Sequence, residues 1–304
     1  MPQLAWLGLG NMGRGMVKNL VEKGSLSSPL IIWNRTVSKA EDFVKTLSNA
    51  TVASSPEEAF SKADIIFICV AADKDVVELI ATAMKGNARG KLFVDCSTIH
   101  PDKTNHISDI LNAASAEFVA CPVFGAPDQA NAGQLISVLA GPKAAVDKVK
   151  PYTKGVMSRL DVDYSDQRPG NATLLKIIGN TFILQMVEAL AEGHTVAEKT
   201  GLGPENLHTF IEALFPGPYT NYSKRMLKGE YYERDYPAFH VDLARKDAGH
   251  ALKLADDAGA RMKAVEVADA HLAEVQKAEP EKGDIAGIYG SVRMEAGLPF
   301  GNKK

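Results

Sequence analysis

Short apolar runs alternate with longer amphipathic stretches over the first half of the chain. The runs are rich in Ile, Leu, Val and Phe and are bounded by polar or small residues, which predicts buried strands separated by helices. Strands joined by helices of this length form a mostly parallel sheet, so we expect an α/β, doubly wound Rossmann domain. The predicted strands are residues 4–7, 29–33, 51–53, 64–70, 91–95, 117–121, 135–140 and 159–164.

The pattern changes after Arg168-Pro169-Gly170. The segment 171–199 contains no proline and is rich in Leu, Ile, Ala and Glu, which predicts one long helix. Glycine and proline pairs divide the remaining sequence into shorter helical segments. These segments are 205–214, 219–228, 240–258 and 263–277. We therefore expect a Rossmann domain over 1–166 and an all-α domain over 167–304, joined by a long interdomain helix.

Composition and charge narrow the possible partners. Of 304 residues, 45% are hydrophobic and 23% are charged, which is typical of a soluble globular protein. The net charge of −3 gives no basic field for nucleic acid or for an anionic membrane, so neither is an expected partner. The three cysteines show no C-x-x-C spacing and are expected to be reduced, buried thiols. The histidines show no metal-ligand spacing, and we expect no metal.

The first predicted strand begins within a few residues of Met1, so we expect no signal or transit peptide. No apolar run is expected to reach the ~18 residues of a membrane span. We therefore expect a cytoplasmic protein.

Gly8, Gly10 and Gly13 have the G-x-G-x-x-G spacing, directly between the first predicted strand and an amphipathic helical segment. In a dinucleotide-binding loop the first glycine allows the sharp turn, the second lets the backbone approach the pyrophosphate, and the third lets the helix pack against the sheet. The amides of Asn11 and Met12 begin that helix and can hold phosphates. A glycine triplet alone is a weak signal, and its position between strand and helix is what predicts a dinucleotide cofactor.

The end of the second predicted strand bears on the type of cofactor. NAD binders usually place an acidic residue there for the ribose 2′-hydroxyl, whereas NADP binders avoid that charge and supply an arginine. This chain has Asn34-Arg35-Thr36. Arg35 can pair with a 2′-phosphate and Thr36 can add a hydroxyl donor, so we expect NADP(H).

Four motifs together resemble the β-hydroxyacid dehydrogenase family, which includes 3-hydroxyisobutyrate dehydrogenase and glyoxylate/succinic semialdehyde reductases and is related to 6-phosphogluconate dehydrogenase. The combination is far more specific than any single motif. The motifs are residues 8–13 with Met16, Asn19 and Leu20, then 95–101, 170–180 and 239–247.

The resemblance implies that Lys176 is the general acid and base and that Asn180 orients the substrate. Residues four apart share one face of a helix, so both can meet the same small ligand. An ammonium group can supply the proton as a carbonyl oxygen gains negative charge during hydride transfer. Taken alone, a lysine in a helix is usually exposed, but its apolar neighbours predict that this stretch is buried.

The remaining expected contacts also follow from the resemblance. It implies that Thr98 lies beside the nicotinamide and the substrate, and that Lys246 reaches the cofactor with Asp247 supporting it. Val70, at the end of the fourth predicted strand, is a further expected cofactor contact.

The segment Phe124-Gly125-Ala126 corresponds to the family's substrate loop and departs from its pattern. The family has Ser-Gly-Gly here, and the serine hydroxyl contacts the substrate carboxylate. A phenyl ring cannot donate a hydrogen bond. The carboxylate contact would then depend on the Gly125 amide, neighbouring amides, Asn180 or Lys176. We therefore expect a substrate that is bulkier or less polar than 3-hydroxyisobutyrate. The alternative is that Phe124 packs in the core and another residue supplies the contact.

We therefore expect an NADP(H)-dependent oxidoreductase that interconverts a small β-hydroxyacid and its semialdehyde or keto acid, as a homodimer or homotetramer. An imine reductase or reductive aminase has the same architecture, but that group generally has Asp or Tyr where this chain has Lys176. A catalytically silent NADP-binding interaction module is a third reading, which retention of Lys176 and Asn180 disfavours. A sugar-phosphate dehydrogenase is disfavoured because the helical domain is short.

Overall fold

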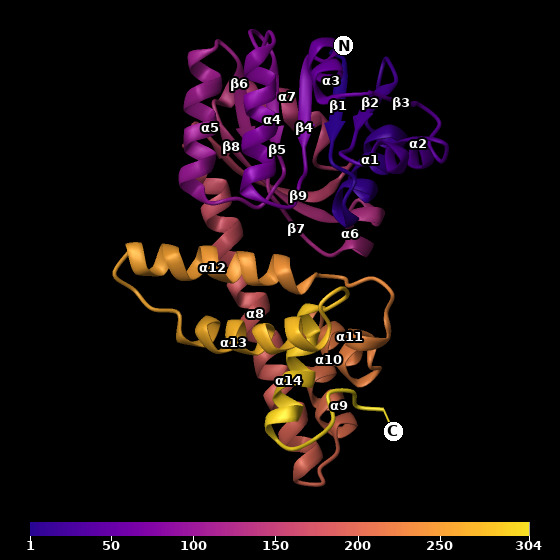
Figure 1. Ribbon diagram of the computed structural model, residues 1–304, viewed down its shortest axis with the longest axis vertical. Helices are drawn as coiled ribbons and strands as arrows, with labels where there is room; N and C mark the ends of the chain where they lie inside the picture. The colour runs from indigo at the N-terminus through magenta and orange to yellow at the C-terminus, as the bar shows by residue number, and fades with distance from the viewer. Residues whose placement is uncertain (304) are drawn as a thin grey trace. The chain divides into compact units, whose positions relative to one another are not determined.

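The computed structural model describes residues 1–303, and its internal contacts divide the chain into two compact units, Met1–Lys176 and Ile177–Lys304. The first unit is α/β and the second is helical (Figure 1). The expected fold class is therefore confirmed. The division falls inside helix α8 (Gly170–Lys199), which begins in the first unit and continues into the second.

The first unit is built on one sheet with the strand order β3-β2-β1-β4-β5-β6-β8-β7, and β9 pairs with β8. The strands are β1 (Leu4–Leu7), β2 (Leu30–Trp33), β3 (Ala50–Val52), β4 (Ile65–Ile68), β5 (Leu92–Asp95), β6 (Glu117–Ala120), β7 (Val123–Phe124), β8 (Leu135–Gly141) and β9 (Ser158–Ser165). The helices are α1 (Asn11–Lys23), α2 (Val37–Val44), α3 (Pro56–Lys62), α4 (Asp73–Lys85), α5 (Pro101–Ala113), α6 (Pro127–Ala132), α7 (Lys143–Val149) and the 3-10 turn η1 (Lys150–Tyr152).

Helices cover both faces of this sheet, which explains the continuous apolar character of its central strands. In β1, Leu4 and Trp6 belong to the core beneath α1 and α7, whereas Ala5 and Leu7 belong to the core beneath α3, α4 and α5. A strand buried on both faces has no solvated side to carry polar residues. The predicted strands lie within one or two residues of the observed ones.

The sheet departs from an all-parallel pattern near β8. Strand β8 pairs antiparallel with both β6 and β7, and parallel with β9. Strand β7 was not expected from the sequence, because two residues between prolines and glycines are too short to show a periodic pattern. Phe124, which the sequence predicts in the substrate loop, is the last residue of this strand.

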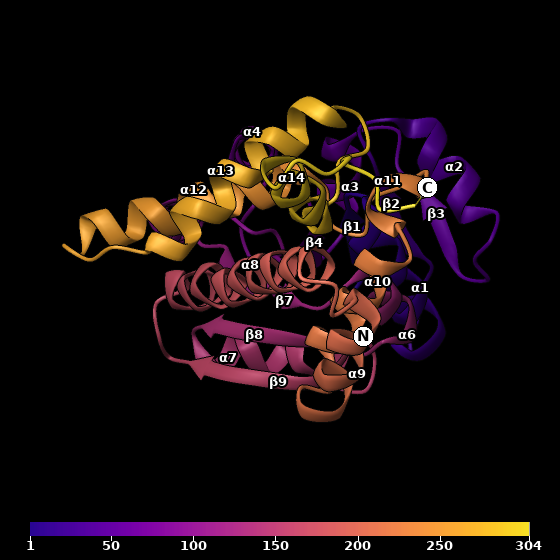
Figure 2. The same ribbon diagram turned by 90° about the horizontal axis from the view of Figure 1, so that it is seen from below.

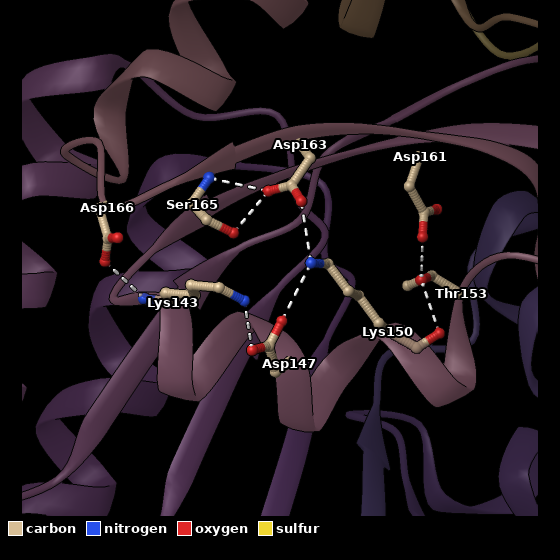
Figure 3. A network of polar contacts seen from close by, with 8 residues as sticks. All are labelled: Lys143, Asp147, Lys150, Thr153, Asp161, Asp163, Ser165 and Asp166. Atoms are coloured by element: carbon tan, nitrogen blue, oxygen red, sulfur yellow. Dashed lines mark hydrogen bonds and ion pairs between the residues drawn. The ribbon is translucent and has the colours of Figure 1, made fainter.

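The edge strand β9 is held to α7 by charged side chains (Figure 3). Lys150 Nζ lies 2.8 Å from Asp163 Oδ2 and 3.0 Å from Asp147 Oδ1, while Lys143 Nζ lies 2.6 Å from Asp147 Oδ2. Hydrogen bonds from Lys150 and Ser165 lower the pKa of Asp163 well below its usual range. These groups are largely solvated, so the network contributes little energy per pair and chiefly keeps the edge strand in place.

The second unit contains the rest of α8 and the helices that pack around it. They are α9 (Pro204–Leu214), α10 (Pro218–Leu227), α11 (Glu230–Glu233), α12 (Val241–Asp257), α13 (Lys263–Ala278), the 3-10 turn η2 (Ile285–Gly287) and α14 (Ile288–Glu295). Figures 1 and 2 both show α12 and α13 lying side by side. The sequence did not predict α11 or α14, since both are too short to show a clear helical period.

Helix α8 is long and apolar enough, by length and composition alone, to cross a membrane, contrary to the expectation that no segment reaches that length. The core helix of a soluble protein passes the same test. Here Leu184, Val187 and Leu190 of α8 pack in the core of the helical unit, and 56% of the 18-residue apolar stretch of α8 is buried.

Candidate cofactor and substrate site

The glycine loop between β1 and α1 requires glycine at two of its three positions. Gly8 has a φ of +105°, and a Cβ atom there would lie 2.2 Å from the carbonyl oxygen of Cys69. A Cβ on Gly13 would lie 2.3 Å from the carbonyl oxygen of Gly8, so the helix could not approach the loop as closely. At Gly10 a Cβ would meet nothing within 4 Å. Neither the fold nor the backbone conformation therefore requires glycine at position 10. The open space there would let the pyrophosphate of a dinucleotide approach the backbone.

The N-terminus of α1, where Asn11 and Met12 lie, suits a phosphate group. Gly10 is its N-cap residue, no side chain caps the helix, and the first turn contains no acidic residue. The positive end of the helix dipole and the first amides are thus not neutralised by a carboxylate of the chain. This arrangement fits the pyrophosphate of a dinucleotide.

Asn34 and Arg35 lie directly after β2, beside this loop. Asn34 Oδ1 accepts a hydrogen bond from the Leu9 amide at 3.0 Å, and Asn34 Nδ2 donates to the Thr36 carbonyl oxygen at 3.0 Å. Asn34 therefore holds the glycine loop to the end of β2. The Arg35 side chain is 83% exposed, and its Nη1 lies 3.3 Å from Asp75 Oδ1. A solvated guanidinium beside the loop can turn toward a phosphate at little cost.

The ends of β4 and β5 are tied together at the same edge of the sheet. Ser97 Oγ accepts a hydrogen bond from the Val70 amide at 3.0 Å, and the Ser97 amide donates to Asp95 Oδ1 at 2.9 Å. Thr98 follows directly and is half-buried. The sequence predicts Asp95 and Ser97 only as members of a motif. Their bonds hold the segments that carry Val70 and Thr98, and these bonds depend on the pairing of β4 with β5, which no local pattern encodes.

Two buried thiols lie beneath this edge. A hydrogen bond with Cys121 and burial raise the pKa of the Cys96 thiol well above its usual value. Such a thiol stays protonated and is not a nucleophile. Cys69 is half-buried, and all three cysteines are free of disulfides.

The segment after β7 forms a tight turn into α6. Gly125 has a φ of +141°, and a Cβ there would lie 2.5 Å from Leu135 Cδ2, so only glycine fits. The Ala126 amide donates to Gln129 Oε1 at 2.9 Å, which uses the donor of that amide within the loop. Sequence reasoning missed Gln129, although a Gln three residues after a helix N-cap is a known capping signal.

Lys176 and Phe124 meet within the first unit. Lys176, in α8, is 8% exposed, and its Nζ lies 4.5 Å from the centre of the Phe124 ring. This distance is that of a cation–π contact, in which the negative face of the ring attracts the ammonium. The sequence predicted both residues for the site but not this contact.

In the helical unit, Asn180 and Lys246 are joined through Asp247. Asn180 Nδ2 donates to Asp247 Oδ2 at 2.7 Å, and Lys246 Nζ lies 3.4 Å from Asp247 Oδ1. Asn180 and Asp247 are both buried. The carboxylate therefore holds the amide and the ammonium in one cluster. The chain connection to Lys176 is direct, because Asn180 follows it by one turn of α8.

The buried Asn19 of α1 fixes the helix that follows the Phe124 turn. Its Nδ2 lies within hydrogen-bond distance of the carbonyl oxygens of Gly15, Ala130 and Asn131. This contact explains why Asn19 accompanies the glycine motif, because it joins the cofactor-loop helix to α6. Among residues 1–303, no group of three or more His, Cys, Asp or Glu side chains is arranged to hold a metal ion.

Comparison with known families places these features in context. Residues 3–160 match the model of the NAD-binding domain of 6-phosphogluconate dehydrogenase, and residues 170–292 match that of NADP-dependent 3-hydroxyisobutyrate dehydrogenase. The chain is 37% identical over 290 residues to the NADH-dependent oxidoreductase ucdB of Aspergillus ustus, covering 95% of this chain and 98% of that protein. It is 30% identical over 262 residues to glyoxylate/succinic semialdehyde reductase 1 of Arabidopsis thaliana, covering 84% and 86% of the two chains.

Solved structures share the fold at low sequence identity. A 3-hydroxyisobutyrate dehydrogenase of Mycobacterium tuberculosis with L-serine has a TM-score of 0.80 at 22% identity, covering 96% of this chain and 99% of that one. Psf3 in complex with NADP+ and 2-OPP has a TM-score of 0.79 at 20% identity, with coverage of 94% and 98%. An imine reductase of Streptomyces aurantiacus has a TM-score of 0.64 at 18% identity, with coverage of 97% and 99%. With both family models matched and the dinucleotide loop intact, the chain belongs to the family of NAD(P)-binding oxidoreductases that contains 6-phosphogluconate dehydrogenase and 3-hydroxyisobutyrate dehydrogenase.

Proposed function

We propose that this protein is an NADP(H)-dependent oxidoreductase that interconverts a small β-hydroxyacid and its semialdehyde or keto acid, with Lys176 as general acid and base. The observation that carries the proposal is the burial of Lys176 in the same compact unit as the glycine loop. Lysine is almost never buried without a partner or a role, and buried titratable groups are concentrated at functional sites.

The chemistry follows from the residue types. A reduced nicotinamide cofactor, held by the glycine loop of residues 8–13, would supply the hydride chemistry. The Lys176 ammonium donates a proton to the carbonyl oxygen as that oxygen gains charge, and in the reverse direction the neutral amine accepts the hydroxyl proton. Asp247 fixes the orientation of the Asn180 amide, which suits Asn180 to orient a substrate rather than to transfer a proton.

The choice of NADP(H) is supported by Arg35 and by the absence of an acid at Asn34. An aspartate there would repel a 2′-phosphate, whereas the exposed Arg35 can pair with it. Two relatives point in different directions, because ucdB is named as NADH-dependent and Psf3 was solved with NADP+. Titration of the protein with NADH and with NADPH distinguishes the two preferences.

Imine reduction is the competing activity, since an imine reductase shares the fold. A cationic iminium beside the Lys176 ammonium would be repelled, which favours a neutral carbonyl substrate. The retained lysine also favours an enzyme over a catalytically silent NADP-binding module.

We further propose a cytoplasmic homodimer or homotetramer assembled through the helical unit. Helices α8 and α9 expose several large apolar side chains, and symmetric association is the usual way to cover such a surface. The exposed apolar side chains of α8 and α9 include Phe182, Val196, Phe210 and Leu214, of which Phe182 is 71% exposed.

The test is NADPH consumption with glyoxylate, succinic semialdehyde, methylmalonate semialdehyde, and bulkier keto and imine substrates, using wild type and Lys176→Ala. We expect one carbonyl class to be turned over, and we expect Lys176→Ala to lower kcat at least ~10³-fold while NADPH affinity is nearly unchanged. Asn180→Ala should be milder. Lys277→Ala is the matched control, because the Lys277 side chain is 72% exposed and lies 2.7 Å from the surface carboxylate of Glu274. If Lys176→Ala retains more than about a tenth of the wild-type kcat, another group protonates the product and the assignment is wrong.

A further inference from the structure

We infer that Phe124 determines substrate specificity by selecting carbonyl compounds that carry an uncharged group, rather than a carboxylate, next to Lys176. The inference rests on the proposed function, from which it keeps the hydride transfer and the role of Lys176, and it replaces the acid substrate with carbonyl compounds in which the carboxylate is esterified, amidated or replaced by an apolar group. It is drawn from residues of the first unit alone.

The ring of Phe124 lies against the Lys176 ammonium. Phe124 is the last residue of β7, and the Lys176 Nζ atom lies 4.5 Å from the centre of its ring. A contact at this distance leaves no room for a substrate group between the ring and the ammonium. The ring therefore covers one side of the proposed proton donor, and a bound substrate has to reach Lys176 from another side, past the edge of the ring.

The chain segment around Phe124 offers few hydrogen-bond donors. The segment Ala120-Cys121-Pro122-Val123-Phe124-Gly125-Ala126-Pro127 contains no hydroxyl, carboxamide, guanidinium or ammonium side chain, and its two prolines lack an amide hydrogen. The Ala126 amide already donates to Gln129 Oε1. A carboxylate needs several donors when it is removed from water, and this segment offers few.

A carboxylate beside the ring loses its water without gaining a hydrogen bond in return. The Lys176 ammonium occupies the face of the ring, so a substrate group meets the ring edge, whose C–H groups are poor hydrogen-bond donors. An ester, an amide, an alkyl group or an aromatic ring meets a smaller desolvation cost and gains apolar contact. Lys176 attracts any anion at longer range, and this attraction is the same in the wild type and in variants at position 124. A difference between these proteins in their preference for the acid or the ester therefore reports on the side chain at position 124.

Position 124 carries the side chain of this turn that contacts Lys176. Gly125 cannot carry a side chain, because its φ is positive and a Cβ would clash with Leu135. The side chain at position 124 is the one that the turn directs at Lys176. A single substitution there should change the preference.

The experiment compares succinic semialdehyde with its methyl ester, two substrates that differ in the charged group. Kinetics with NADPH are measured for wild type, Phe124→Ser and Phe124→Leu, with NADPH affinity and thermal unfolding as checks on folding. We expect the wild-type kcat/KM to be at least tenfold higher for the ester. Phe124→Ser should lower this ratio at least tenfold, chiefly through a lower KM for the acid, whereas Phe124→Leu, which also lacks a donor, should keep the preference for the ester.

A wild-type preference for the acid, or an unchanged ratio in a folded Phe124→Ser variant, would overturn the inference. Binding of the non-reacting pair butyrate and butyramide to the protein with NADP+, followed by calorimetry, gives a readout independent of turnover. The amide should bind more tightly to wild type, and tighter binding of butyrate would contradict the inference. If no carbonyl compound is reduced at all, the proposed function fails, and the calorimetric arm still decides whether Phe124 disfavours a carboxylate.

Discussion

At the scale of single residues, Asn34 joins two segments of the proposed cofactor site. Its carboxamide accepts from the Leu9 amide and donates to the Thr36 carbonyl, so it braces the glycine loop while leaving no negative charge there. An aspartate could accept the same hydrogen bond but could not donate to Thr36. The exposed Arg35 is then the nearest flexible cation in the chain segment that follows β2.

Arg35→Ala should therefore weaken NADPH binding, because it removes one charge-assisted contact with a 2′-phosphate. Such a contact contributes roughly 1.5 to 3 kcal/mol, so the Kd should rise about ten- to hundredfold. Adding Asn34→Asp should shift the preference to NADH. Fluorescence titration with both cofactors measures this, with Arg261→Ala in the helical unit as a control. Tighter binding of NADH than of NADPH by the unmodified protein would show that the assignment is wrong.

Gly10 and Gly13 offer a matched pair of substitutions within one loop. A Cβ at position 10 meets nothing, so Gly10→Ala should leave the free energy of unfolding within about 0.5 kcal/mol while raising the Kd for NADPH at least tenfold, since the methyl group would occupy space that the pyrophosphate needs. A Cβ at position 13 clashes with the Gly8 carbonyl, so Gly13→Ala should lower the free energy of unfolding by roughly 1 to 3 kcal/mol. Urea unfolding and cofactor titration separate the two effects. Unchanged NADPH affinity in Gly10→Ala would argue against the proposed path of the pyrophosphate.

At the scale of the elements, a histidine joins three helices of the second unit. His271 of α13 lies 2.8 Å from Glu188 of α8 and 3.1 Å from Glu295 of α14. The close pairing with the Glu188 carboxylate outweighs burial and raises the pKa of His271 from 6.5 to about 9. The histidine is thus charged at neutral pH and links helices that are distant in the sequence.

The raised pKa predicts a loss of stability at alkaline pH. A group whose folded pKa lies above its unfolded value stabilises fully below about pH 6.5 and loses that contribution as the pH rises through about 9. Between pH 7 and 10 the wild type should lose about 1 kcal/mol more of its unfolding free energy than His271→Gln loses. This value is smaller than the full pKa shift would give, because Glu295 is solvated and its interaction with His271 is screened. Urea unfolding at both pH values, followed by circular dichroism, measures the difference. Parallel pH dependence of the two proteins would show that the ion pair does not stabilise the unit.

At the scale of the whole molecule, the exposed apolar side chains of α8 and α9 predict association. Sedimentation at micromolar concentration should show a dimer or larger species, and Phe182→Asp with Phe210→Asp should shift it toward monomer, since charges would be buried in the interface. Tyr236→Asp is the control, because Tyr236 is 80% exposed but lies outside these helices. A wild-type protein that is only monomeric would contradict the prediction.

Much of the architecture was determined by the sequence itself, because a strand buried on both faces must be apolar throughout and a dinucleotide loop must have glycine where the backbone turns or approaches. Leu4–Leu7, Gly8, Gly13 and the long helix beginning near residue 170 are such cases. Only the tertiary structure revealed the short strand β7, the bonds of Asn34, the Gln129 cap and the ring of Phe124 against Lys176. Local patterns record which residues must be buried and which backbone conformations are required, whereas contacts between residues tens of positions apart depend on how strands pair and turns close, and no local period encodes them.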